Sequence, residues 1–337
     1  MGWESSLLSQ LPAVRKLKGM ETESKDIQKL EVFGILKEAV SIPCKNINFL
    51  VFSIMISFPL FSFLIYYESF LLKTLAQTSD ILSTHSYSNY NWPLPDHLIT
   101  ESMNKDFAYK LIQLGLLYLL PLHLLELFTM LLTIDLASKI YSSEERPTMT
   151  LKEMIDKPIY IAKLGAALIT SVYVLILSTC TLLGLIWLVI NYYILLRNLI
   201  YNVLFAVIYG SAFVALLTKY LEWSAQWIMG IVISILEEIK GVEALVLSAY
   251  FSRGNEKRGR VLMLVFFVWG VCLRLPCLVF GCYESGHGMV LQNVFYSLGS
   301  LIKWVACMVY FYDCKKRILE KKIDEEVGIV ETSLGIK

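Results

Sequence analysis

Six long apolar stretches alternate with polar segments along this chain of 337 residues. An α-helix needs roughly twenty mainly apolar residues to cross a bilayer, because it rises about 1.5 Å per residue and the hydrocarbon core is about 30 Å thick. We therefore predict six transmembrane helices, near residues 46–67, 111–134, 165–188, 199–217, 261–281 and 289–311. The third and fourth come from one apolar run, which polar and aromatic residues around Arg197 divide into a hairpin.

Two further segments have helical periodicity with one apolar face. Residues Leu30 to Val40 predict an amphipathic helix that leads into the first span. Residues 222–260 begin with an apolar stripe that includes Trp223 and Ile235, which predicts a separate helix at the membrane interface. The expected fold class is all-α, a polytopic integral membrane bundle of about six transmembrane helices plus amphipathic interfacial helices. The expected regions are an N-terminal segment 1–45, a membrane domain 46–312 and a C-terminal tail 313–337.

The distribution of positive charge predicts the orientation of this bundle. Cytosolic loops of membrane proteins retain an excess of Lys and Arg. With the N-terminus in the cytosol, the cytosolic segments hold 24 of the 30 Lys and Arg residues, the outer loops hold four, and Arg274 and Lys303 lie inside spans. We therefore expect both termini in the cytosol. The compartment stays open between endomembrane, such as the endoplasmic reticulum, and plasma membrane.

Composition agrees with a membrane protein and argues against several other classes. Apolar residues make up 56% of the chain and charged residues only 18%, against about 25% charged in soluble domains. The net charge of +1 provides no basic field for nucleic acid. Seven cysteines without a Cys-x-x-Cys pair predict neither a disulfide framework nor a zinc site. Cys44 and Cys314 adjoin predicted spans, so each is either a palmitoylation site or an ordinary cysteine near the membrane.

Charged residues inside the spans are candidates for function, because a charge at mid-helix costs about 2.5 to 3.5 kcal/mol on insertion scales. Span two carries His123 and Glu126 on one helical face, span five carries Arg274 and span six carries Lys303. Counting residues from the outer ends places Glu126 and Lys303 at similar depth, so we predict that they pair. The pair either fixes helix neighbours or forms a proton- or substrate-coupling site. One His and one Glu are too few ligands for a metal site.

The segment between spans four and five provides a second group of candidates. Its basic end could touch anionic lipid as a plain interfacial helix, or serve as a cytosolic docking surface. The candidate residues on this segment are Trp223, Glu237, Glu238, Gly241, Glu243, Ser248, Arg253, Lys257, Arg258 and Arg260.

The same residues carry a resemblance. The run Trp223, Glu237-Glu238, Gly241, Glu243-Ala244-Leu245, Ser248, Gly254 and Arg260 resembles the central segment of a plant family of six-span membrane proteins of unknown function. Some members are labelled as binding proteins of a polyadenylate-binding protein. A looser pattern is similar to the membrane domain attached to some bacterial glycerophosphodiester phosphodiesterases. The catalytic barrel of those enzymes has no counterpart in this chain, so the resemblance implies no hydrolase activity.

Two functions follow as hypotheses. The first is a non-enzymatic membrane organiser or adaptor that acts through the segment 222–260. The second is a small-solute or lipid transporter that uses the charged residues inside the spans. We expect no enzymatic activity and no cofactor, because motifs such as a Walker loop or His-Glu-x-x-His are missing. Membrane lipids are the expected partners, with membrane or cytosolic proteins and a second copy of the chain as further candidates, and nucleic acid is not expected.

Overall fold

Helices make up every element that the computed structural model describes, in backbone ranges 31–88, 109–110, 112–142, 161–197, 202–279 and 287–334. The all-α prediction is therefore confirmed. Other parts of the chain, including the predicted turn after Arg197 and residues 89–108 of the predicted first outer loop, lie outside the described residues. The described elements are α3 (Val32–Lys45), α4 (Ile47–Ser88), the π-helical η1 (Tyr118–Leu122), α6 (His123–Ser142), α8 (Ile161–Arg197), α9 (Asn202–Leu236), α10 (Val242–Ser252), α11 (Glu256–Val279) and α12 (His287–Leu334).

Each of the six predicted spans overlaps a helix, and four described helices are long and apolar enough to cross a membrane. These four apolar stretches are Ile47–Thr74, Ile112–Ser142, Lys163–Tyr192 and His287–Lys321. The helices α9 and α11, which overlap the predicted fourth and fifth spans, are not among them. Their apolar stretches are interrupted, because α9 contains Lys219 and Glu222, and α11 starts with charged residues.

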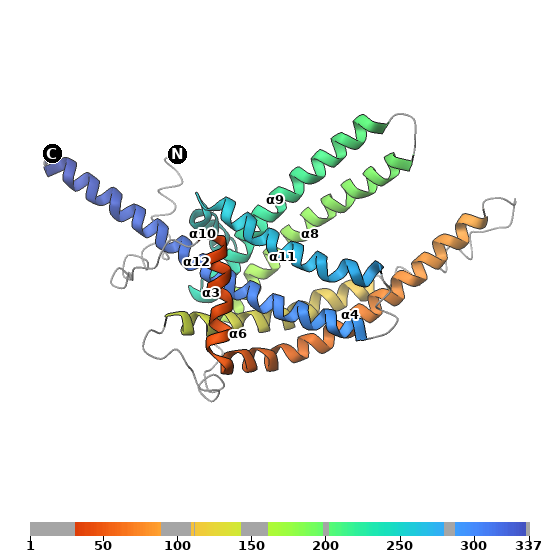
Figure 1. Ribbon diagram of the computed structural model, residues 1–337, viewed down its shortest axis with the longest axis horizontal. Coiled ribbons are helices and arrows are strands. Elements are labelled where there is room, and N and C mark those ends of the chain that lie inside the picture. The colour runs from red at the N-terminus through yellow and green to blue at the C-terminus, as the bar shows by residue number, and fades with distance from the viewer. Residues whose placement is uncertain are drawn as a thin grey trace.

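The long helices separate into two groups (Figure 1). Helices α8 and α9 form an antiparallel hairpin that projects away from the group formed by α4, α6, α11 and α12. Only 6% of the most apolar stretch of α8 is buried, against 56% for α12. The apolar surface of the hairpin therefore faces outward over most of its length, whereas α12 is a central helix of the molecule.

The core lies at the end of the molecule where α3, α10, the start of α11 and residues 301–315 of α12 meet, which we call the closed end. Fully buried residues from several helices fill it, including Ile134 on α6, Val232 on α9, and Met308 and Phe311 on α12. The rings of Phe251 and Phe311 meet edge to face at 5.8 Å and join α10 to α12. The opposite end, where α11 ends and α12 begins, we call the open end.

Helix α3 confirms the predicted amphipathic helix. It buries Ile35, Ala39 and Ile42, whereas Phe33 on the opposite face is 78% exposed. The buried face contacts α12 and the start of α4. Helix α3 therefore closes one side of the core and is not only a surface segment.

Three element boundaries differ from the expectation. The apolar stripe from Trp223 to Ile235 is the second half of α9 and not a separate interfacial helix, because Val232, Ile233 and Ile235 are fully buried in the core. The segment 222–260 consists instead of this half of α9, a break, α10 and the start of α11. Helix α4 continues beyond the predicted span to Ser88, and the predicted tail is helical as far as Leu334.

Candidate functional site

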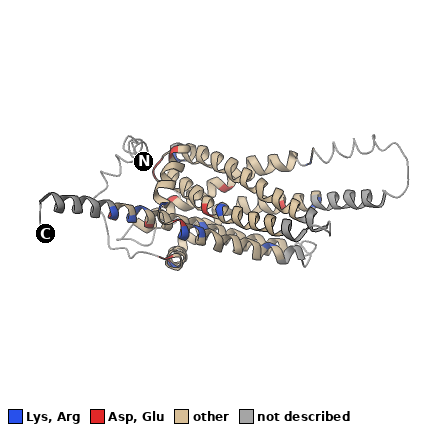
Figure 2. Cartoon of the chain, turned by 90° about the horizontal axis from the view of Figure 1, so that it is seen from above, with Lys and Arg blue, Asp and Glu red and all other residues tan. Residues whose placement is uncertain are grey.

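Charged residues gather toward the closed end, whereas most of the other half of the molecule carries few of them (Figure 2). Ion pairs at this end join helices that are distant in sequence. We call these residues the ion-paired layer; they are Asp135, Lys139, Lys163, Glu222, Glu237, Arg258, Arg260, Asp313, Lys315 and Arg317.

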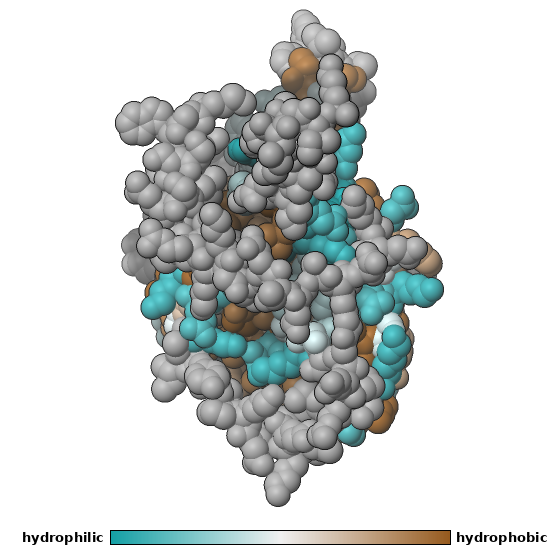
Figure 3. All heavy atoms as spheres, turned by 90° about the vertical axis from the view of Figure 1, so that its left-hand side faces the viewer, coloured by the Kyte–Doolittle hydropathy of each residue, from teal (hydrophilic) through white to brown (hydrophobic). Residues whose placement is uncertain are grey.

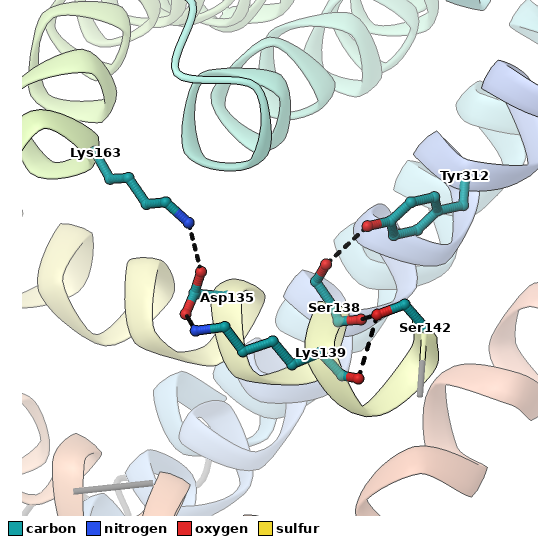
Figure 4. Close-up of polar contacts among 6 residues, drawn as sticks. All are labelled: Asp135, Ser138, Lys139, Ser142, Lys163 and Tyr312. Atoms are coloured by element: carbon teal, nitrogen blue, oxygen red, sulfur yellow. Dashed lines mark hydrogen bonds and ion pairs between the residues drawn. The ribbon is translucent and has the colours of Figure 1, made fainter. Parts of the chain in front are cut away.

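Asp135 joins α6 to α8 (Figure 4). Its Oδ1 accepts a hydrogen bond from Lys163 Nζ at 2.8 Å, and its Oδ2 accepts one from Lys139 on the next turn of α6. One turn along, the hydroxyls of Ser138 and Tyr312 lie 2.7 Å apart and join α6 to α12. Two basic side chains on one carboxylate neutralise it and satisfy its oxygens, which fixes the start of α8 against α6.

Asp313 and Lys315 attach the segment after α9 to α12. Asp313 Oδ2 accepts hydrogen bonds from Arg258 Nη1 at 2.9 Å and from Arg317 Nε at 2.8 Å, and its side chain is only 6% exposed. Lys315 Nζ donates to Glu237 Oε1 at 2.7 Å. A carboxylate this deeply buried requires such partners. The first residues of the predicted C-terminal tail are therefore part of the folded core.

The predicted basic cluster is divided between two roles. Arg258 and Arg260 turn inward, and Arg260 Nη2 donates to Glu222 Oε2 at 2.8 Å. Arg253 and Lys257 are exposed. The basic end, predicted either to touch anionic lipid or to form a docking surface, therefore has two arginines paired with carboxylates on α12 and α9 and two exposed basic side chains.

The chain breaks between α9 and α10 at the acidic pair and Gly241. Glu238 and Gly241 both have positive φ, at 59° and 58°. The Gly241 N–H donates to Thr170 Oγ1 on α8 at 2.9 Å. A Cβ at Gly241 would lie 3.2 Å from the Tyr173 ring and 3.3 Å from Ile169, so both its backbone conformation and the close approach of α8 favour glycine.

Helices approach one another closely on both sides of the break. A Cβ at Gly230 would lie 2.8 Å from Leu245, and one at Gly259 would lie 2.8 Å from the Tyr310 hydroxyl. That hydroxyl donates to the Asn255 carbonyl at 3.1 Å, within the turn between α10 and α11. Ser248 is buried and donates to the Leu245 carbonyl of its own helix. The residues of the predicted central motif thus mainly position α9, α10, α11 and α12.

The predicted pair of Glu126 and Lys303 is not formed. Neither side chain belongs to an ion pair within the described part of the chain. Lys303 Nζ lies 4.7 Å from the centroid of the Trp304 ring, whereas Glu126 interacts electrostatically with Tyr296, two turns nearer the open end. The residue count assumed straight helices, but the π-helical η1 precedes Glu126 and changes both the rise and the facing of the helix.

The other two charged candidates have neighbours on adjacent helices. His123 Nε2 lies 3.3 Å from Ser171 Oγ on α8. The Arg274 guanidinium lies 5.8 Å from the centroid of the Tyr296 ring, as expected for a cation–π contact. Arg274 is therefore placed against α12, and His123 against α8 of the hairpin.

One polar contact was missed by the sequence analysis. Asn293 Nδ2 on α12 donates to Glu68 Oε2 on α4 at 2.9 Å. Asn293 is 1% exposed, and neither its Oδ1 nor the Oε1 of the adjacent Gln292 has a hydrogen-bond partner. The sequence placed Glu68 in a loop just after the first span. The apolar residues that follow it, Phe70 to Leu72, were the signal that the helix continues.

The two lipidation candidates differ in access. Cys44 is exposed, whereas Cys314 is fully buried among the core residues of α12. Palmitoylation of Cys314 in the folded protein is therefore excluded, because the thiol cannot reach an acyl donor. No group of three or more metal-ligating side chains occurs within the described ranges.

The family of the chain follows from a match that covers this whole arrangement. A family model described as "Domain of unknown function (DUF8558)" matches residues 20–320. The chain belongs to the DUF8558 family. The match runs from before α3 to residue 320 on α12, so the DUF8558 domain includes the closed end and all the long helices. No curated protein and no solved structure matches the chain. The resemblance to a plant family of six-span proteins stays a prediction.

Proposed function

We propose that this DUF8558 protein is a multi-pass integral membrane protein with six spans and both termini in the cytosol. The four long apolar helices support membrane insertion. The alternation of helix directions and the bias of 24 against four basic residues support the inclusion of α9 and α11 as spans. In this orientation the closed end is the cytosolic end, and the membrane is that of the endoplasmic reticulum or the plasma membrane.

Within the membrane, we propose a non-enzymatic role as an organiser or adaptor. The observation that carries this proposal is the ion-paired layer, which holds the segment after α9 rigidly against α12 and so presents a fixed surface. Hydrophilic side chains are prominent on the described part of the face at this end (Figure 3). Its exposed residues carry both signs of charge and include Glu238, Glu243, Arg253 and Lys257.

A rigid surface of mixed charge favours a protein partner more than a lipid surface. Anionic lipid attracts clusters of unpaired basic residues, but Arg258 and Arg260 are paired with carboxylates. Exposed apolar groups accompany the charges, because Val242 is 55% exposed and Val246 is 47% exposed. The proposed partner is therefore a cytosolic protein that contacts α10 and the turns at its two ends.

Proximity labelling from the C-terminus tests the adaptor role. The double variant Arg253→Glu/Lys257→Glu changes exposed charges on this surface, and we expect it to lose specific neighbours while the amount of folded protein stays unchanged. The matched control is Lys73→Glu/Lys110→Glu, which makes the same charge change toward the open end. The same neighbours in the wild type and both variants would contradict the adaptor role.

A transporter remains the second candidate function. It is favoured by the charged and polar groups around Tyr296 between α4, α6, α11 and α12, since charged groups inside a membrane protein often mark a pathway for solutes or protons.

A further inference from the structure

Two buried amide oxygens without partners lie on one side of α12 near the open end. Gln292 is 5% exposed and Asn293 is 1% exposed, and Gln292 Oε1 and Asn293 Oδ1 accept no hydrogen bond. Tyr296 lies four residues after Gln292 and three after Asn293, so it borders both side chains on the buried side of α12. A buried acceptor without a donor is unfavourable by about 1 to 3 kcal/mol, which makes two adjacent ones uncommon.

A carboxylate from another helix faces the same place. Glu68 on α4 accepts one hydrogen bond, from Asn293 Nδ2 at 2.9 Å. An ionised carboxylate has about four acceptor positions, so most of its capacity remains open. The Asn293 amide nitrogen bonds to this carboxylate. The amide oxygen of Asn293, which has no donor, is a further hydrogen-bond acceptor. These side chains form a group rich in hydrogen-bond acceptors. We call it the Glu68 cluster; it consists of Glu68, Gln292, Asn293 and Tyr296.

The charged groups around the cluster carry a net negative charge that one monovalent cation would neutralise. Arg274 lies 5.8 Å from the Tyr296 ring, Glu68 is bonded to Asn293 one turn away on α12, and Glu126 is near enough for its charge to act on this tyrosine. Two carboxylates and one guanidinium carry a formal charge of about −1 when all are ionised. A ligand with a single positive charge would neutralise this excess, and an acceptor-rich cluster would bind it through N–H donors.

Aromatic and apolar side chains pack around the cluster. The rings of Tyr67 and Tyr118 lie 6.1 Å apart, and Tyr296 packs against the apolar cluster of Leu60, Leu64 and Leu122. Tyrosine faces attract organic cations, and leucine side chains exclude water from a charged contact. This lining suits the methylene groups beside a primary ammonium better than a hydrated inorganic cation.

We propose that the Glu68 cluster is a binding site for a primary organic ammonium group. The N–H groups donate to Glu68, Asn293 Oδ1 and Gln292 Oε1, which satisfies both orphaned oxygens at once. Quaternary ammonium groups have no N–H and leave these oxygens unpaired, so the site discriminates ethanolamine from choline. The site does not depend on the adaptor role, and it supplies a substrate class for the transport alternative.

The ammonium has two sources. Asn293 lies six residues from the start of α12, or about 9 Å along it, which in the proposed orientation is close to the outer headgroup region. A free amine solute and the headgroup of phosphatidylethanolamine carry the same chemical group. Each source requires its own measurement.

Thermal unfolding of the purified full-length protein tests both. In detergent, ethanolamine hydrochloride is titrated against choline chloride at equal ionic strength. In nanodiscs, phosphatidylcholine is compared with a phosphatidylcholine–phosphatidylethanolamine mixture. We expect a saturable rise of the midpoint with ethanolamine for a solute site, or a rise only with phosphatidylethanolamine for a headgroup site. The proposal is overturned if neither raises the midpoint, or if choline is as effective as ethanolamine.

Variants assign the effect to the cluster. Glu68→Gln should raise the half-saturating ethanolamine concentration, or reduce the phosphatidylethanolamine effect, by about tenfold or more, because one charged hydrogen bond is lost. Glu243→Gln is the control, since it makes the same change at an exposed site on α10. Gln292→Leu removes one orphaned oxygen, so it should weaken binding while the ligand-free midpoint stays level or rises. Unchanged binding in both Glu68→Gln and Gln292→Leu overturns the proposal, whether or not the adaptor test succeeds.

Discussion

At the scale of single residues, the backbone conformation and the packing at Gly241 both favour glycine. Its φ of 58° with ψ of −126° is a region that residues with a Cβ rarely adopt, and its N–H is bonded to Thr170 on another helix. Glu238, three residues earlier, also has positive φ at 59°. The break between α9 and α10 is therefore held by its contacts with α8 and not by local preference alone.

Replacing Gly241 tests this reading. Gly241→Ala places a Cβ 3.2 Å from Tyr173 in a strained backbone region, so we expect a loss of about 1 to 3 kcal/mol of stability. The measurement is the thermal unfolding midpoint of the purified protein. Gly270→Ala is the matched control, because a Cβ on this helical glycine meets nothing within 4 Å. Equal midpoints for both variants would show that the break tolerates a side chain.

The sequence identified several charged residues of the site but not which of them form ion pairs with each other. The charged residues of the spans and of the segment 222–260 could be selected from the sequence, because charge in an apolar chain is conspicuous. Their partners could not, because Glu237 pairs with Lys315 and Arg258 with Asp313, 78 and 55 residues away. Such pairings depend on how helices rotate against one another, which a residue count does not include.

At the scale of elements, the segment after α9 is attached to α12 by charge. The side chains of Lys315 and Glu237 are 11% and 19% exposed, and those of Arg258 and Asp313 are 23% and 6% exposed. Screening by water is limited at such burial, so each bond matters to the folded state. Short α10 could not hold its place alone, since an isolated helix of 11 residues is marginal in water.

A charge swap tests the attachment. Glu237→Lys and Lys315→Glu should each lower the free energy of unfolding by about 3 kcal/mol, because each leaves two like charges together in a partly buried place. The double swap should recover most of that loss, as measured by thermal unfolding. Glu320→Lys is the control on the same helix, where the more exposed pair with Lys316 predicts a change below about 0.5 kcal/mol. Additive losses in the double swap would mean that the two residues act separately.

The apolar centre of each helix was predicted well, whereas the residues at which the helices end were predicted poorly. The six apolar stretches all became helices, since a long apolar run with few breakers has little alternative. The continuation of α9 to Leu236 and of α4 to Ser88 was missed, because polar residues within a helix read as a membrane boundary when only hydropathy is considered. Tertiary contacts decided these ends.

At the scale of the molecule, the two ends of the bundle have different character. The closed end has a packed core and ion pairs between helices, and the hairpin of α8 and α9 projects from it, with only 6% of the most apolar stretch of α8 buried. An exposed apolar surface of this extent is stable in lipid and not in water. The asymmetry fits a membrane protein whose folded domain on one side anchors loosely packed spans.

Accessibility of single cysteines tests the proposed topology. In a background in which all seven native cysteines are replaced, we expect Lys73→Cys and Lys257→Cys to face opposite sides of the membrane of sealed vesicles. A membrane-impermeant maleimide should label the residue at 73 only from the outer or lumenal side, and the residue at 257 only from the cytosolic side. Labelling of both from one side would mean that one of the three long helices between them, α6, α8 or α9, does not cross, which reduces the number of spans.

The sequence by itself determined the all-helical class and the position of every long helix, because these follow from the length and continuity of apolar runs. It also provided the charge bias on which the proposed orientation rests. Only the tertiary structure decided that α9 continues into the core, that Arg274 meets Tyr296, and that Glu68 meets Asn293. These are contacts between helices, and they depend on rotation, tilt and the π-helical η1, to which hydropathy along the chain is insensitive.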